Sequence, residues 1–232
     1  MTYLRFASTA PPEVRRRPLR VRPQGPPPRV PEPPGGDDWG DHHGDEDAFR
    51  PPLSNACLGM LVFLGAETMF FAGLIGTFLV FRVASEAWPP PAMPRLPVGV
   101  TGLNTLVLLA SAYTMWQAQQ AARRGLLRRL LHGLGLTALL GVTFLLVQGY
   151  EWMRLLGFGL TLASGVYGAT FYTLIGCHAL HVCGAVLWLL GVTLRAWRGR
   201  MALPSTGLTL CGMYWYYVVG LWPVLYTLVY LA

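Results

Sequence analysis

One apolar stretch of the sequence, residues 164–195, constrains the fold most. It contains no charged side chain before Arg195, its last residue. A single helix of this length, rising about 1.5 Å per residue, would be roughly 46 Å long. The hydrocarbon core of a bilayer is only about 30 Å thick. We therefore predict a membrane-spanning helix that tilts or continues past the membrane surface.

Four other apolar segments have the length of membrane spans. Charged residues make up only 12% of the chain, about half the share of a soluble domain. The sequence thus predicts an all-α membrane protein, a bundle of five transmembrane helices packed closely through frequent small residues. The other four predicted spans cover residues 55–81, 98–117, 133–153 and 207–231.

The first fifty residues differ in composition from the rest. They contain the proline-rich PPPRVPEPP and the acidic GDDWGDHHGDEDAF. Such a segment cannot bury enough apolar surface to offset its ordering entropy, so we expect a disordered tail over residues 1–52 and a membrane domain over 53–232. His42 and His43 could bind a divalent ion weakly, although a solvated tail is the simpler interpretation.

The distribution of arginine predicts the orientation in the membrane. The loops after the second and fourth spans hold seven Arg, whereas those after the first and third hold three. By the positive-inside rule, the N-terminus lies in the cytoplasm and the C-terminus outside a bacterial plasma membrane. The basic charge flanks the spans, which indicates membrane topology and not nucleic-acid binding. Four tryptophans fall near predicted interfaces: Trp88, Trp116, Trp152 and Trp197.

Glu67 is the sharpest functional signal, because it lies near the middle of the first span. A carboxylate at membrane depth costs several kcal/mol. It must therefore face a partner or a cavity, or carry a proton. Two interpretations remain open: a neutral structural carboxyl bonded between helices, or a reactive protonatable acid near a lipid or a proton path.

A second cluster, Cys177, His178, His181 and Cys183, lies in the central span. Because these residue types ligate metals, a metal or haem site is one interpretation. Cys183 points elsewhere on a helix, however, and no other span contributes a histidine. We therefore favour a hydrogen-bonded helix–helix contact and expect no metal. The four cysteines are interpreted as small buried hydrophobes, not as a disulfide framework.

Three further polar residues lie within the spans or at their ends. Glu151 is three residues before Arg154, a spacing that favours an ion pair on one helix face. Gln148 lies one turn before Glu151. Asn104, in the second span, is expected to donate a hydrogen bond to a neighbouring helix.

Taken together, five segments resemble subunit III of the haem–copper oxidases, in the five-span form that lacks the first two helices of the longer version. They occur in the family's order and cover nearly all of residues 55–232. The segments are ETMFFAGLIGTFLVFR, LNTLVLLASAYTMWQA, FLLVQGYEW, SGVYGATFYTLIGCHALHV and YWYYVVGLWPVLYTLVYL.

The resemblance implies a non-catalytic accessory subunit of a respiratory terminal oxidase in aerobic electron transport. Such a subunit carries no haem or copper, packs against catalytic subunit I in a complex with subunit II, binds phospholipid between its helices and supports proton uptake. Glu67 matches the family's carbodiimide-reactive glutamate. Glu151 matches the glutamate of its Gln-x-x-Glu segment, and His178 with His181 matches its His-x-x-His pair.

The last span departs from the family's pattern. Where the family has Tyr-Trp-His-Phe-Val-Asp, this chain has Tyr216 and Val219 in place of His and Asp. A polar contact there is therefore lost or remade. Two alternatives to the oxidase stay open: an accessory subunit of a nitric oxide reductase, and a small proton-coupled transporter that uses Glu67. The transporter is disfavoured because the chain shows no internal repeat.

Overall fold

The computed structural model describes residues 54–88, 90 and 98–231. Five helices in this part of the chain are long and apolar enough to cross a membrane, as the sequence predicts. The tail expected at residues 1–52, with His42 and His43, lies outside the described residues. The helices are α1 (Asn55–Ala84), α2 (Val98–Arg123), α3 (Leu127–Gly157), α4 (Val166–Trp197) and α5 (Thr206–Tyr226), and a π-helical turn η1 (Thr227–Leu231) follows α5.

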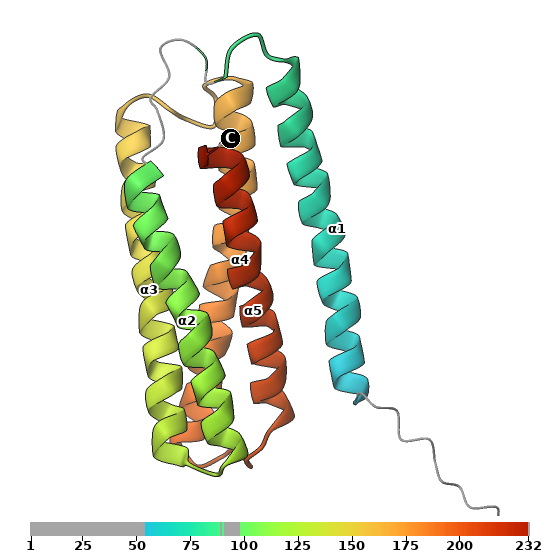
Figure 1. The fold of residues 1–232 in the computed structure, drawn as a ribbon, viewed down its shortest axis with the longest axis vertical. Helices are drawn as coiled ribbons and strands as arrows, with labels where there is room; N and C mark the ends of the chain where they lie inside the picture. Colours follow the sequence, from blue (N-terminus) through green and yellow to red (C-terminus); the bar gives the residue numbers. More distant parts are fainter. Residues whose placement is uncertain (1–53, 89, 91–97, 232) are drawn as a thin grey trace, which may run out of the picture. The chain divides into compact units, whose positions relative to one another are not determined.

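The helices α2 to α5 form the packed part of the membrane domain. Figure 1 shows α2 and α3 side by side, and they make the most extensive helix–helix contact. The helix α1 packs mainly on α4 and α5 and leaves most of its apolar surface uncovered. The α2–α3 and α4–α5 connections lie at one end of the bundle, whereas the chain's C-terminus lies at the other (Figure 1).

Several helix ends differ from the prediction. The segment AARRGLLRRLLH was predicted to be a loop, but only residues 124–126 connect α2 to α3. Arg128 and Arg129 lie in the first turn of α3. The prediction followed the apolar spans alone, whereas Arg and Leu are both good helix formers, so the helices continue beyond the apolar segment.

The α2–α3 turn is short because glycine permits it. Gly125 has φ of 68°, in the left-handed region that favours glycine. The Gly125 N–H donates to the Ala122 carbonyl at 3.1 Å, and the Leu126 N–H donates to the Ala121 carbonyl at 2.9 Å. This is the hydrogen-bond pattern of a Schellman motif, which ends α2 and lets α3 start at once.

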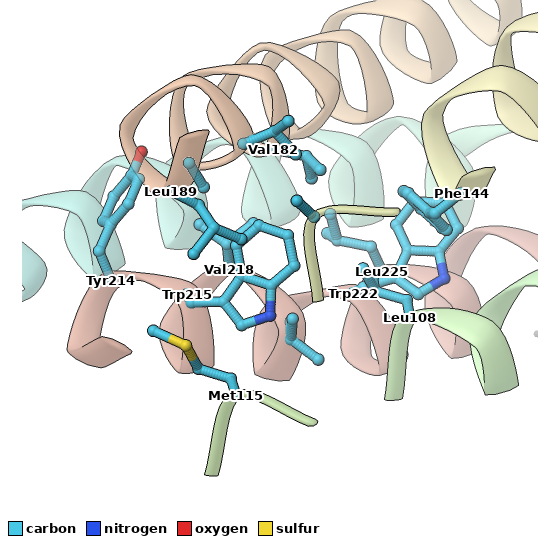
Figure 2. Packing of buried hydrophobic residues seen from close by; sticks show 14 of the residues in the cluster. Leu108, Met115, Phe144, Val182, Leu189, Tyr214, Trp215, Val218, Trp222 and Leu225 are labelled. Atoms are coloured by element: carbon cyan, nitrogen blue, oxygen red, sulfur yellow. The ribbon is translucent and has the colours of Figure 1, made fainter. Parts of the chain in front are cut away.

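Two tryptophans of α5 fill the centre of the bundle. Trp215 and Trp222 are each 1% exposed, and Figure 2 shows both indoles among apolar side chains of the surrounding helices. The Trp215 Nε1–H donates to Ser111 Oγ at 3.2 Å and the Trp222 Nε1–H to Thr105 Oγ1 at 2.8 Å. Both bonds go to α2, so they tie the two helices together while burying the indole rings.

The tryptophans expected at the interfaces divide into two groups. Trp116 and Trp197 are exposed near helix ends, as an aromatic belt requires. Trp88 instead packs edge-on against Phe78 of α1 and Tyr167 of α4, with ring centroids 5.5 and 4.9 Å apart. Trp152 of α3 likewise packs edge-on against Tyr172 of α4, with ring centroids 5.8 Å apart, so both rings link helices.

Candidate functional site

Glu67 of α1 and His181 of α4 form a polar side-chain contact between these two helices. Glu67 Oε2 lies 2.8 Å from His181 Nε2, and their side chains are 19% and 21% exposed. Phe71 contacts the His181 ring edge-on, with centroids 5.0 Å apart. The sequence indicated both residues separately, but it did not pair them, because they are 114 positions apart.

The contacts of His181 limit how protons are shared in this pair. His181 Nδ1 lies 2.7 Å from the Cys177 carbonyl oxygen, which can only accept a hydrogen bond. Nδ1 therefore carries a proton. One further proton then lies between Nε2 and the carboxyl: either neutral Glu67 donates it to Nε2, or imidazolium donates it to carboxylate. The pair is neutral overall in both forms, which lowers the free-energy cost of placing these groups at membrane depth.

The His178 ring lies in an aromatic environment and not in the hydrogen-bonded contact expected from the sequence. It is 1% exposed, and neither ring nitrogen has a hydrogen-bond partner among the described residues. Its ring stacks on Trp222 with centroids 5.1 Å apart and planes at 26°. His181 therefore makes a hydrogen bond between helices, whereas His178 packs against the ring of Trp222 of α5.

The cysteines do not join the histidines in a ligand set. Within residues 54–88, 90 and 98–231, no three His, Cys, Asp or Glu side chains come together as a metal site would require. Cys211 is buried, Cys57 and Cys177 are half-buried, and Cys183 is exposed. The interpretation of all four as buried hydrophobes is therefore wrong for Cys183, which lies on the outward face of α4.

Gln148 and Glu151 lie buried toward the end of α3, each 4% exposed. Glu151 Oε1 accepts from Arg154 Nη1 at 3.5 Å, the pairing that the spacing predicts. Gln148 Nε2 donates to the hydroxyl of Tyr230 in η1 at 3.2 Å. The two side chains therefore have separate partners, and Gln148 links α3 to the end of the chain.

Asn104 makes the interhelical bond expected of it. Its Nδ2 donates to the Phe144 carbonyl of α3 at 3.0 Å. Two other α2 contacts were not foreseen: Thr114 Oγ1 lies 2.7 Å from Thr137 Oγ1 of α3, and Gln119 Oε1 accepts from Tyr216 at 3.1 Å. Tyr216 stands where the family pattern has histidine, so a polar contact is made at that position. No sequence signal could pair these residues, since Thr and Gln are common in helices.

An apolar groove of about 430 Å³ separates α1 from α5. Its walls include Phe71 and Ile75 of α1 and Leu221 and Val224 of α5. The Glu67–His181 pair lies close by, since Phe71 contacts His181 and also lines the groove. The lining is apolar apart from Thr68, Tyr216 and Tyr217.

Comparison with known proteins gives one consistent result. Residues 51–232 match the sequence profile of the family described as cytochrome c oxidase subunit III. The chain is 34% identical over 195 residues to cytochrome c oxidase subunit 3 of Synechocystis sp., covering 82% of this chain and 78% of that protein. It is also 34% identical over 179 residues to cytochrome c oxidase subunit 3 of Bacillus subtilis, covering 76% and 86%.

Proposed function

This chain belongs to the cytochrome c oxidase subunit III family, and from that premise we propose that it is a non-catalytic accessory subunit of a bacterial respiratory haem–copper oxidase. The match over residues 51–232, which includes every described helix, carries the proposal. The similar proteins named above are all cytochrome c oxidase subunits 3, which does not favour a nitric oxide reductase or a transporter.

Its partners are the catalytic subunits of the oxidase, subunit I directly and subunit II within the same complex. The haem and copper belong to those partners. Much of the α1 surface supports such docking: Met69 is 79% and Val83 84% exposed. Apolar surface of this kind is stable only against lipid or another membrane protein.

In this role the chain protects the catalytic subunit and supports its proton uptake. The helices shield one flank of the catalytic subunit from water, and phospholipid held in the α1–α5 groove completes the seal. The Glu67–His181 pair supports proton uptake by keeping a proton inside the apolar layer. Catalysis in this proposal belongs to the partner subunits, and the described residues of this chain hold no group of three metal-ligating side chains.

Removal of the subunit tests the proposal. The oxidase should be purified with and without this chain, and oxygen consumption followed from the first turnovers to inactivation. We expect much of the initial rate to survive, because no redox centre is removed. Activity should then decay faster during turnover, as slow proton delivery exposes the oxygen-reducing site to side reactions. Adding the chain back should slow this loss of activity during turnover.

Two results would contradict this function. One is immediate and complete loss of oxygen reduction while the haems of the remaining complex are intact. The other is purification through this chain that brings down no haem–copper subunit. Elemental analysis of the isolated chain provides a separate check, because stoichiometric copper, zinc or iron bound through Cys177, His178 or His181 would contradict the absence of a metal site.

A further inference from the structure

A second cavity, away from the Glu67–His181 pair, lies between the end of α2 and the start of α3. Its volume is about 650 Å³. Three guanidinium groups line it, from Arg124 in the turn and from Arg128 and Arg129 on α3. Trp116 and Gln120 of α2 and Leu136 of α3 also line it. The cavity is therefore basic toward the end of the bundle and apolar toward its middle.

The backbone explains why a cavity forms there. Gly133 of α3 lies so close to Ala118 of α2 that an added Cβ would be 2.9 Å from the Ala118 Cβ. Here the two helices touch through their smallest residues. The Gly125 turn brings Arg124 next to the first turn of α3. The space beside this close contact is walled by the longer side chains, so its shape is set by the helix packing.

The arginines of this cavity lack an acidic partner in the described part of the chain. Neither of the two ion pairs found there involves Arg124, Arg128 or Arg129. The described acids are elsewhere. Glu67 is paired with His181, Glu151 lies about 34 Å farther along α3 than Arg128 at 1.5 Å per residue, and Glu86 follows α1 at the end opposite the α2–α3 turn (Figure 1).

We propose that this cavity binds an anionic phospholipid through its phosphate. The guanidinium groups hold the phosphate oxygens by paired, charge-assisted hydrogen bonds. The acyl chains run along Trp116 and Leu136 toward the middle of the membrane. Trp116 is 50% exposed and stacks with Tyr113 at 5.8 Å, as aromatic side chains do at headgroup depth. Basic pockets between transmembrane helices recognise anionic headgroups in this way.

This site is distinct from the α1–α5 groove in position and chemistry. The groove is lined by apolar, threonine and tyrosine side chains with no charged group, so it does not select a headgroup. The α2–α3 cavity selects anionic over zwitterionic lipid. The inference depends on the membrane location of the chain and not on its accessory role, so either can fail without the other.

Tryptophan quenching tests the site in the purified full-length chain, together with whatever subunits co-purify with it. The purified protein is placed in nanodiscs that contain phosphatidylglycerol or phosphatidylcholine with brominated acyl chains. The signal of Trp116 is the difference between the wild type and Trp116→Phe. We expect brominated phosphatidylglycerol to quench it at a mole fraction at least about fivefold lower than brominated phosphatidylcholine, the factor that one Arg near an anionic lipid supplies. Equal quenching by both lipids would overturn the proposal.

Charge variants identify the groups responsible. R124Q/R128Q/R129Q should abolish the preference for phosphatidylglycerol, whereas the lysine triple R124K/R128K/R129K should keep part of it. The matched control is R195Q/R198Q/R200Q, which removes three exposed charges at the end of α4, outside the cavity. Loss of the preference in this control too would mean that general surface charge attracts the lipid, and the site would be refuted.

Inorganic phosphate distinguishes a lipid headgroup from a free anion. At a constant ionic strength, millimolar phosphate in place of chloride should leave the quenching by phosphatidylglycerol unchanged, because the lipid is held by its acyl chains as well. If phosphate abolishes the preference, the cavity is a site for the free ion and the lipid assignment is wrong. Co-purification of the complex confirms that each variant is folded.

Discussion

Glu67 shows how a single polar residue is tolerated at membrane depth. It lies 2.8 Å from His181, whose other ring nitrogen is committed to its own helix through the Cys177 carbonyl. The shared proton keeps the pair neutral. The structure therefore shows Glu67 bonded between α1 and α4, and its reactivity stays a prediction.

Substitutions at Glu67 separate hydrogen bonding from proton exchange. In Glu67→Gln the amide N–H can donate to His181 Nε2, so stability should change by less than about 1 kcal/mol. Glu67→Ala leaves Nε2 without a partner and should lose about 1–3 kcal/mol. Thermal unfolding of the complex measures both. If the two variants are equally destabilised, the hydrogen bond is not what holds α1 to α4 at this point.

Carbodiimide labelling measures which acid is protonated in an apolar setting. A hydrophobic carbodiimide reacts with a neutral carboxyl within the membrane, so it should modify Glu67 before Glu86, which is exposed, and before Glu151, which faces Arg154. Mass spectrometry of peptides gives the order of modification. Labelling of Glu86 or Glu151 first, with Glu67 untouched, would show that Glu67 is ionised and sheltered.

At the scale of the elements, α3 and α5 meet through a glycine and a tryptophan. A Cβ added at Gly141 would lie 2.5 Å from Trp215 Cη2, and Trp215 is 1% exposed with its indole N–H bonded to Ser111. The indole can move only by giving up that bond. The packing of α5 on α2 and α3 thus depends on the absence of a side chain at Gly141.

A pair of matched variants on α3 tests this contact. Gly141→Val should destabilise the bundle by about 1–3 kcal/mol through overpacking. Gly149→Val is the control, because nothing lies within 4 Å of a Cβ at Gly149. Both changes carry the same helix propensity, so the difference between their unfolding midpoints measures the clash. Similar midpoints would mean that Trp215 relocates easily.

At the scale of the whole molecule, the distribution of arginine predicts how the helix bundle is oriented in the membrane. The seven Arg that follow the second and fourth predicted spans lie in or beside the α2–α3 and α4–α5 connections, and both connections lie at the same end of the bundle (Figure 1). The positive-inside rule predicts that this end faces the cytoplasm. A reporter that is active only after export, fused after Ala232, should be active, and one fused within residues 199–204 should not. The reverse pattern would invert the proposed topology.

The sequence by itself determined the number of spans and which polar residues lie within them. Uncharged runs of this length have no stable alternative to membrane helices, because every backbone polar group must be bonded internally. Glu67, His181 and Asn104 were identifiable for the same reason: polar side chains are rare where water is absent. The helix ends were harder to predict, since Arg128 and Arg129 extend α3 beyond its apolar segment.

The tertiary structure decided which of these residues meet. Glu67 could have paired with either histidine of α4. It bonds His181, whereas the His178 ring stacks on Trp222 and has no hydrogen-bond partner among the described residues. The basic cavity likewise depends on the contact of Gly133 with Ala118 and on the turn at Gly125. Hydropathy records how deeply a residue lies in the membrane, but partners across helices are set by helix rotation and close packing, which a pattern along one chain does not encode.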